Sequence, residues 1–92
     1  MKEVDIFKAS ADDESFTVEL DLPRYIIYEE ENDTVYVGVV LMVDKWGIHY
    51  PDENEWESGR PVSDDDAQRI IKNIESAMHF MGKKKYVILK GV

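Results

Sequence analysis

The chain has 92 residues, of which 43% are apolar and 11% aromatic, and its 20 acidic and 11 basic residues give a formal net charge of −9. This length suits a single domain, residues 1–92, and the apolar and aromatic content excludes a disordered acidic tail. The absence of cysteine excludes disulfides and thiolate metal sites. The acidity argues against a nucleic-acid ligand, because such ligands require a basic surface.

The first half of the chain has the patterns of β-strands. Residues 3–6 and 16–21 alternate apolar with polar side chains, which predicts two strands, the second of them clearly half-buried. Residues 25–30 and 34–43 carry apolar or β-branched side chains on both faces, which is typical of central strands. Residues 46–50 complete the set as a fifth strand, which the following proline ends.

The second half contains a well-marked amphipathic helix. Ser63 is its expected N-cap, with Asp66 three residues later in the arrangement of a capping box. Apolar residues then recur at steps of three and four as one stripe: Ala67, Ile70, Ile71, Ile74, Ala77, Met78 and Met81. Gly82 is expected to end the helix, and residues 86–90 to form a last strand.

These elements predict an α+β domain of order β-β-β-β-β-α-β, with a mostly antiparallel sheet of five to six strands and one helix packed on one face. A helix of about 19 residues is about 28 Å long and covers one sheet face only. The second face is nevertheless apolar, with Tyr36, Val40 and Met42 on it. Three covers are possible: the loop over residues 51–62 anchored by Trp56, strong curling of the sheet, or a partner chain.

The sequence offers no arrangement of residues with the chemistry of an active site. No acidic pair lies in an apolar setting, and His49 and His79 are far apart in the chain. The acidic run over residues 52–55 departs from the EF-hand pattern, and no glycine-rich phosphate loop occurs. We therefore expect no catalytic residues, no cofactor and no metal site, and a protein that is not an enzyme.

The charge is unevenly distributed, since residues 1–66 hold 19 of the 20 acidic residues. This surface either keeps a small domain soluble or meets a basic partner, for which charge complementarity speeds encounter. The loop tryptophan is either the anchor of a lid or an exposed contact. The predicted partner-binding residues are those of two acidic segments and one tyrosine of the uncovered face: Glu29, Glu30, Glu31, Asp52, Glu53, Glu55, Trp56, Glu57 and Tyr36.

The segment from Trp56 to Gly82 resembles the C-terminal part of small acidic immunity proteins found beside bacterial polymorphic toxins. The resemblance rests on the tryptophan, a nearby proline, an acidic helix start and later isoleucines: Trp56, Pro61, Ser63, Asp64, Asp65, Asp66, Arg69, Ile70 and Ile74. It implies a protein that binds one cognate toxin and blocks its active site without catalysis.

The function predicted from these observations is that of a small acidic binding protein, and the resemblance implies an immunity protein that occludes a basic toxin site. The alternative is a homo-oligomeric domain of unassigned role, in which a second copy closes the uncovered sheet face. Residues 1–5 contain no apolar signal segment, and the longest apolar run is Val39 to Val43. We therefore expect a cytoplasmic protein with no membrane or nucleic-acid partner.

Overall fold

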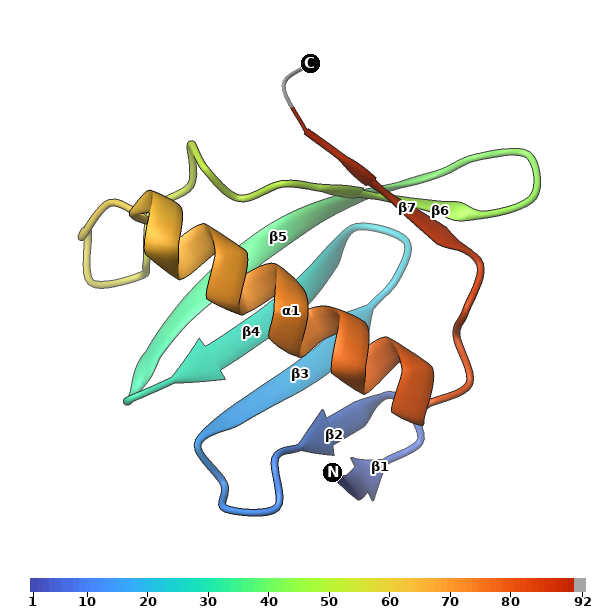
Figure 1. Cartoon of the computed structure of the whole chain (residues 1–92), viewed down its shortest axis with the longest axis horizontal. Coiled ribbons are helices and arrows are strands. Elements are labelled where there is room, and N and C mark those ends of the chain that lie inside the picture. Colours follow the sequence, from blue (N-terminus) through green and yellow to red (C-terminus); the bar gives the residue numbers. More distant parts are fainter. Residues whose placement is uncertain (91–92) are drawn as a thin grey trace.

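Seven strands form one sheet in sequential order, and a single helix lies across one of its faces (Figure 1). The computed structural model describes residues 1–90. The predicted α+β class with one helix on a mostly antiparallel sheet is confirmed. The elements are β1 (Lys2–Asp5), β2 (Lys8–Ser10), β3 (Phe16–Asp21), β4 (Tyr25–Glu30), β5 (Asp33–Leu41), β6 (Trp46–His49), α1 (Asp64–Phe80) and β7 (Tyr86–Leu89).

The strand count exceeds the expected five to six because β2 was not predicted. This strand has three residues with small or basic side chains, so its sequence carries no alternation signal. It forms because Ala9 lies opposite Val18 of β3 in an antiparallel ladder, where Ala9 is fully buried. Pairing with a strong neighbour therefore overrides a weak local preference.

The last two strands, β6 and β7, run parallel, whereas all other neighbours are antiparallel. A parallel pair needs a long crossover, and α1 together with its flanking loops supplies it. No helix within residues 1–90 is long and apolar enough to cross a membrane.

Strand β5 pairs with two neighbouring strands, each along a different part of its length. Its residues from Asp33 to Gly38 pair with β4, and those from Val39 to Leu41 pair with β6. The strand ends two residues earlier than expected, because the hairpin turn begins where the Met42 N–H donates to the Lys45 carbonyl at 2.8 Å. The first part of β5 therefore has a free edge on the β6 side.

The predicted limits of α1 are confirmed at both ends. Ser63 Oγ accepts a hydrogen bond from the Asp66 N–H at 3.0 Å, and an Asp66 carboxylate oxygen accepts one from the Ser63 N–H, which completes the capping box. At the other end, Gly82 adopts a φ of 77°, and the Lys83 N–H donates to the Met78 carbonyl at 2.8 Å. Glycine adopts this left-handed conformation at little cost, so the helix ends there.

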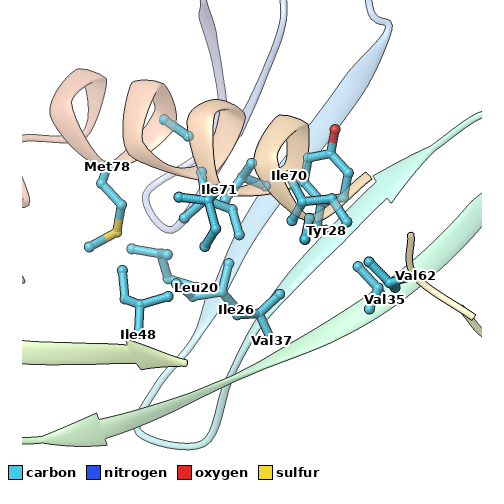
Figure 2. Packing of buried hydrophobic residues seen from close by; sticks show 14 of the residues in the cluster. Leu20, Ile26, Tyr28, Val35, Val37, Ile48, Val62, Ile70, Ile71 and Met78 are labelled. Atoms are coloured by element: carbon cyan, nitrogen blue, oxygen red, sulfur yellow. The ribbon is translucent and has the colours of Figure 1, made fainter. Parts of the chain in front are cut away.

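The core lies between α1 and the sheet (Figure 2). Ile70, Ile71 and Met78 of the predicted stripe point toward the sheet. Buried strand residues meet them there, and Trp56 and Val62 belong to the same cluster. The strand residues of this cluster are Val18, Leu20, Ile26, Tyr28, Val35, Val37 and Ile48.

Candidate functional site

The face of the sheet opposite α1 has no helix over it in the described part of the chain. Side chains alternate between the two faces of a strand. Because Ile26, Tyr28, Val35 and Val37 are buried in the α1 core, their neighbours lie on the other side. We call this side the open face; its central residues are Tyr25, Ile27, Tyr36, Val40, Met42, His49 and Leu89.

The open face stays accessible in the single chain. Tyr25, Tyr36, Val40 and Met42 are between 38% and 43% exposed. Leu41 and Val43 are also exposed, because they lie at the tip of the β5–β6 hairpin beyond the core cluster. The described chain therefore leaves an apolar surface uncovered.

Two glycines lie beneath side chains of the open face. A Cβ atom at Gly47 would lie 2.9 Å from both Leu89 Cδ1 and Val40 Cγ1, so these side chains lie over the glycine backbone. The ring of His49 occupies the corresponding space beside Gly38. A surface of aliphatic side chains with tyrosines resembles the centre of protein interfaces in composition.

Tyr25 and Tyr36 form the aromatic part of this surface. Their rings meet edge to face with centroids 5.7 Å apart, a favoured geometry for aromatic pairs. Tyr36 was predicted as a contact residue, whereas Tyr25 was not. The apolar run at the start of β4 could have identified Tyr25, because that run already placed tyrosine and isoleucine on the outer face.

The loop over residues 51–62 lies along the free edge of β5. The Glu57 N–H donates to the Thr34 carbonyl at 2.8 Å, and Asn54 Nδ2 donates to the Tyr36 carbonyl at 2.8 Å. This loop takes the place of a neighbouring strand and leaves the Tyr36 ring exposed. It therefore does not cover the open face, which was one of the three expected possibilities.

Trp56 anchors this loop in the core, so its predicted role as a partner contact is wrong. Its side chain is only 1% exposed and packs against Tyr28, with ring centroids 6.3 Å apart. The guanidinium of Arg60 lies 4.9 Å from the Trp56 ring centroid. An acidic sequence around a tryptophan thus did not mean an exposed ring, because the side chain points inward while the flanking carboxylates point out.

The two predicted acidic segments lie at the same end of the molecule, near the start of α1 (Figure 1). Asp33 joins them, since its carboxylate accepts hydrogen bonds from the Ser58 hydroxyl at 2.7 Å and from the Ser58 N–H at 3.2 Å. These bonds lower the pKa of Asp33 below its ordinary value. Arg60 lies 3.7 Å from Asp33 and 3.8 Å from Asp66, which ties the loop to the helix as well.

One of the predicted contacts, Glu30, is engaged inside the fold. Arg69 bridges Glu30 and Asp66, and the Tyr28 hydroxyl donates to Glu30 at 2.7 Å. Asn73 Nδ2 donates to the same hydroxyl at 2.8 Å. The hydrogen bond from Arg69, together with those from Ser63, lowers the pKa of Asp66 to about 2. Burial raises the pKa of Tyr28.

The remaining predicted carboxylates are exposed and take part in no salt bridge within residues 1–90. They are Glu29, Glu31, Asp52, Glu53, Glu55 and Glu57. Glu57 is linked to the open face, because its Oε1 accepts a hydrogen bond from the Tyr36 hydroxyl at 2.9 Å. This contact raises the pKa of Tyr36. We call these six side chains the acidic rim.

A hollow of about 690 Å³ lies between the start of β3, the β4–β5 turn and α1. Residues 29–31 line it from the turn, Arg69 and Lys72 line it from the helix, and residues 14–17 line it beside β3. The described residues contain no group of three or more histidine and carboxylate side chains that could hold a metal ion. Among the charged residues that line this hollow, Glu30 and Arg69 form a salt bridge.

Comparison of the chain with protein families, with curated proteins and with solved structures gives no match to any of them. The resemblance to immunity proteins therefore stays a prediction, and so does the absence of catalysis.

Proposed function

We propose that this chain is a small acidic binding protein that docks the open face and the acidic rim onto a basic protein partner. One observation carries the proposal: the apolar open face adjoins the acidic loop over residues 51–62. The exposed Tyr25–Tyr36 pair lies on this face, and the Tyr36 hydroxyl donates a hydrogen bond to Glu57 of the loop. Contiguous apolar surface of this kind is typical of interaction sites.

The two parts of the surface have different roles in the proposal. The carboxylates of the acidic rim attract a basic partner and orient it, an effect that acts mainly on the association rate and weakens with salt. The tyrosine pair, together with Val40 and Met42, supplies the apolar area whose burial holds the complex together. Inhibition would then be steric, because a bound chain covers the partner's cleft and no bond is made or broken.

The resemblance of the Trp56–Gly82 segment to immunity proteins supports a more specific form of this proposal. In that form the partner is a toxin domain with a basic active-site cleft, such as a nuclease, and the two proteins meet in the cytoplasm. The acidic rim would occupy positions that the partner uses for an anionic substrate.

The test is binding of the purified product of the adjacent gene to the full chain. We expect a complex that forms at low salt and weakens as salt rises. Substitution of both tyrosines, Tyr25→Ser and Tyr36→Ser, should weaken it strongly. The matched control is Phe80→Ser, which removes an exposed aromatic side chain of α1 on the other side of the sheet. Failure of the adjacent gene product to bind at low salt, or a stable homodimer that buries Tyr36 and Met42, contradicts the proposal.

A further inference from the structure

The sheet has two free edges, at β1 and β7, which are the first and last strands in its order. Within residues 1–90, β1 pairs only with β2, and β7 pairs only with β6. A free edge presents unpaired backbone N–H and carbonyl groups that can accept a further strand. These edges are separate from the acidic rim, and the β7 edge adjoins the open face at Leu89.

The backbone of β7 is well suited to accept a strand. The Lys85 and Leu89 carbonyls accept hydrogen bonds from Trp46 and Tyr50 of the β6 side, each at 3.0 Å. Because successive backbone groups of a strand point in opposite directions, those of Tyr86 and Ile88 point away from β6. The strand consists of four aromatic or aliphatic residues, Tyr86–Leu89, all of them partly exposed.

The two edges carry opposite charges. Lys84 and Lys85 are exposed immediately before β7, whereas Glu3 and Asp5 are exposed on β1. None of these four side chains takes part in a salt bridge within residues 1–90. Their charges are therefore available to a neighbouring chain.

These charges distinguish the possible pairings between copies of the chain. In an antiparallel pair of two β7 edges, Lys85 of each copy would lie beside Lys90 of the other, and like charges across a ladder are destabilising. β1 also carries Lys2, but that side chain forms a salt bridge with Glu14 at 3.3 Å. An antiparallel pair of β1 with β7 would bring Glu3 and Asp5 toward the lysines that precede β7. That pairing also buries Val4, which is 53% exposed on β1, against the apolar strand.

We propose that a second copy of this chain is the occupant of the β7 edge, and that it inserts its β1 strand there to continue the sheet. The contact is head-to-tail, so a pair of copies keeps one free β1 and one free β7, and association can extend beyond two chains. It leaves the open face uncovered, so it is independent of the binding function proposed above.

The experiment is sedimentation of the full chain over a range of concentrations at low ionic strength. The weight-average mass should rise above that of one chain and fall back when salt is added. Glu3→Lys alone, and Lys84→Glu with Lys85→Glu, should each raise the concentration required about tenfold, which corresponds to a loss of about 1.4 kcal/mol. An equimolar mixture of these two variants should recover association, because each β1 then meets a β7 edge of opposite charge.

The matched control is Glu53→Lys, which makes the same charge change on the loop over residues 51–62. It should leave association unchanged, although the net charge of the chain changes equally. A mass of one chain at all concentrations overturns the proposal. It is also overturned if association persists in both edge variants, or if Tyr36→Ser abolishes association while Glu3→Lys does not, since the open face would then be the contact.

Discussion

The hydroxyl of Tyr36 donates a hydrogen bond to Glu57 Oε1 at 2.9 Å, across 21 positions of the chain. It connects an exposed ring of the open face with a carboxylate of the acidic rim. The negative charge of Glu57 disfavours loss of the Tyr36 proton and so raises the pKa of Tyr36.

The titration of Tyr36 tests this contact directly. We expect Glu57→Gln to return the pKa of Tyr36 toward its ordinary value, because the substitution removes the negative acceptor. The measurement is the pH dependence of the Tyr36 ring carbon resonance, assigned with Tyr36→Phe. Glu53→Gln removes the same charge from the same loop and should leave the pKa of Tyr36 unchanged. Equal shifts of this pKa in both variants would mean that the total charge of the loop, and not the contact with Glu57, sets it.

Replacement of Asp66 should change how stability depends on pH. Its pKa is about 2 in the folded state, below the ordinary value of 3.8 for an aspartate, so the stabilisation is present above the unfolded value and is lost as the pH falls through the folded one. Asp66→Asn should reduce the free energy of unfolding by about 1 to 2 kcal/mol at neutral pH, and the deficit should shrink between pH 4 and pH 2. Urea unfolding at a series of pH values measures this. Asp65→Asn, at an exposed neighbouring position, should leave the pH dependence of the free energy of unfolding unchanged. A similar loss of stability in Asp65→Asn would show that the contacts of Asp66 are not the cause.

The buried position of Trp56 predicts a large effect on stability. Trp56→Ala should cost about 3 to 5 kcal/mol, the range for loss of a large buried aromatic side chain. In a Trp46→Phe background, the remaining fluorescence of Trp56 should be shielded from a soluble quencher. Ready quenching in the folded protein would show an exposed ring and would restore Trp56 as a contact.

The two glycines of the open face should respond differently to alanine. At Gly47 a Cβ atom would lie 2.9 Å from two side-chain carbons, which must then move, so Gly47→Ala should destabilise by about 1 to 3 kcal/mol. At Gly38 the nearest atom, His49 Cδ2, is 3.4 Å away. Gly38→Ala should therefore be neutral, or stabilising by up to about 1 kcal/mol, since alanine restricts the unfolded chain. Thermal unfolding compares the two; equal losses would contradict the packing over Gly47.

Local signals of the sequence were sufficient for most of the fold. The alternation over residues 16–21 and the capping box at Ser63 gave the correct elements, because each is encoded by neighbouring residues. Strand β2 could not be predicted in this way, since the buried position of Ala9 depends on its pairing with Val18. The division of β5 between two partners likewise depends on register.

The candidate site was only partly predictable for the same reason. The two acidic segments were recognisable as charge runs, but their proximity depends on Asp33 and Ser58, which are 25 positions apart. The inward orientation of Trp56 was one of two predicted possibilities, and only tertiary packing distinguishes them. The engagement of Glu30 by Arg69 joins residues 39 positions apart, which no local pattern reveals.

The proposed single binding surface, made of the open face and the acidic rim, can be tested by calorimetric titration. The adjacent gene product is titrated into the wild-type chain and into Tyr25→Ser/Tyr36→Ser. We expect tight binding by the wild type and an affinity at least about 100-fold lower for the variant, because two aromatic anchors are lost. Equal affinity for the two proteins, with the variant shown to be folded, would contradict it.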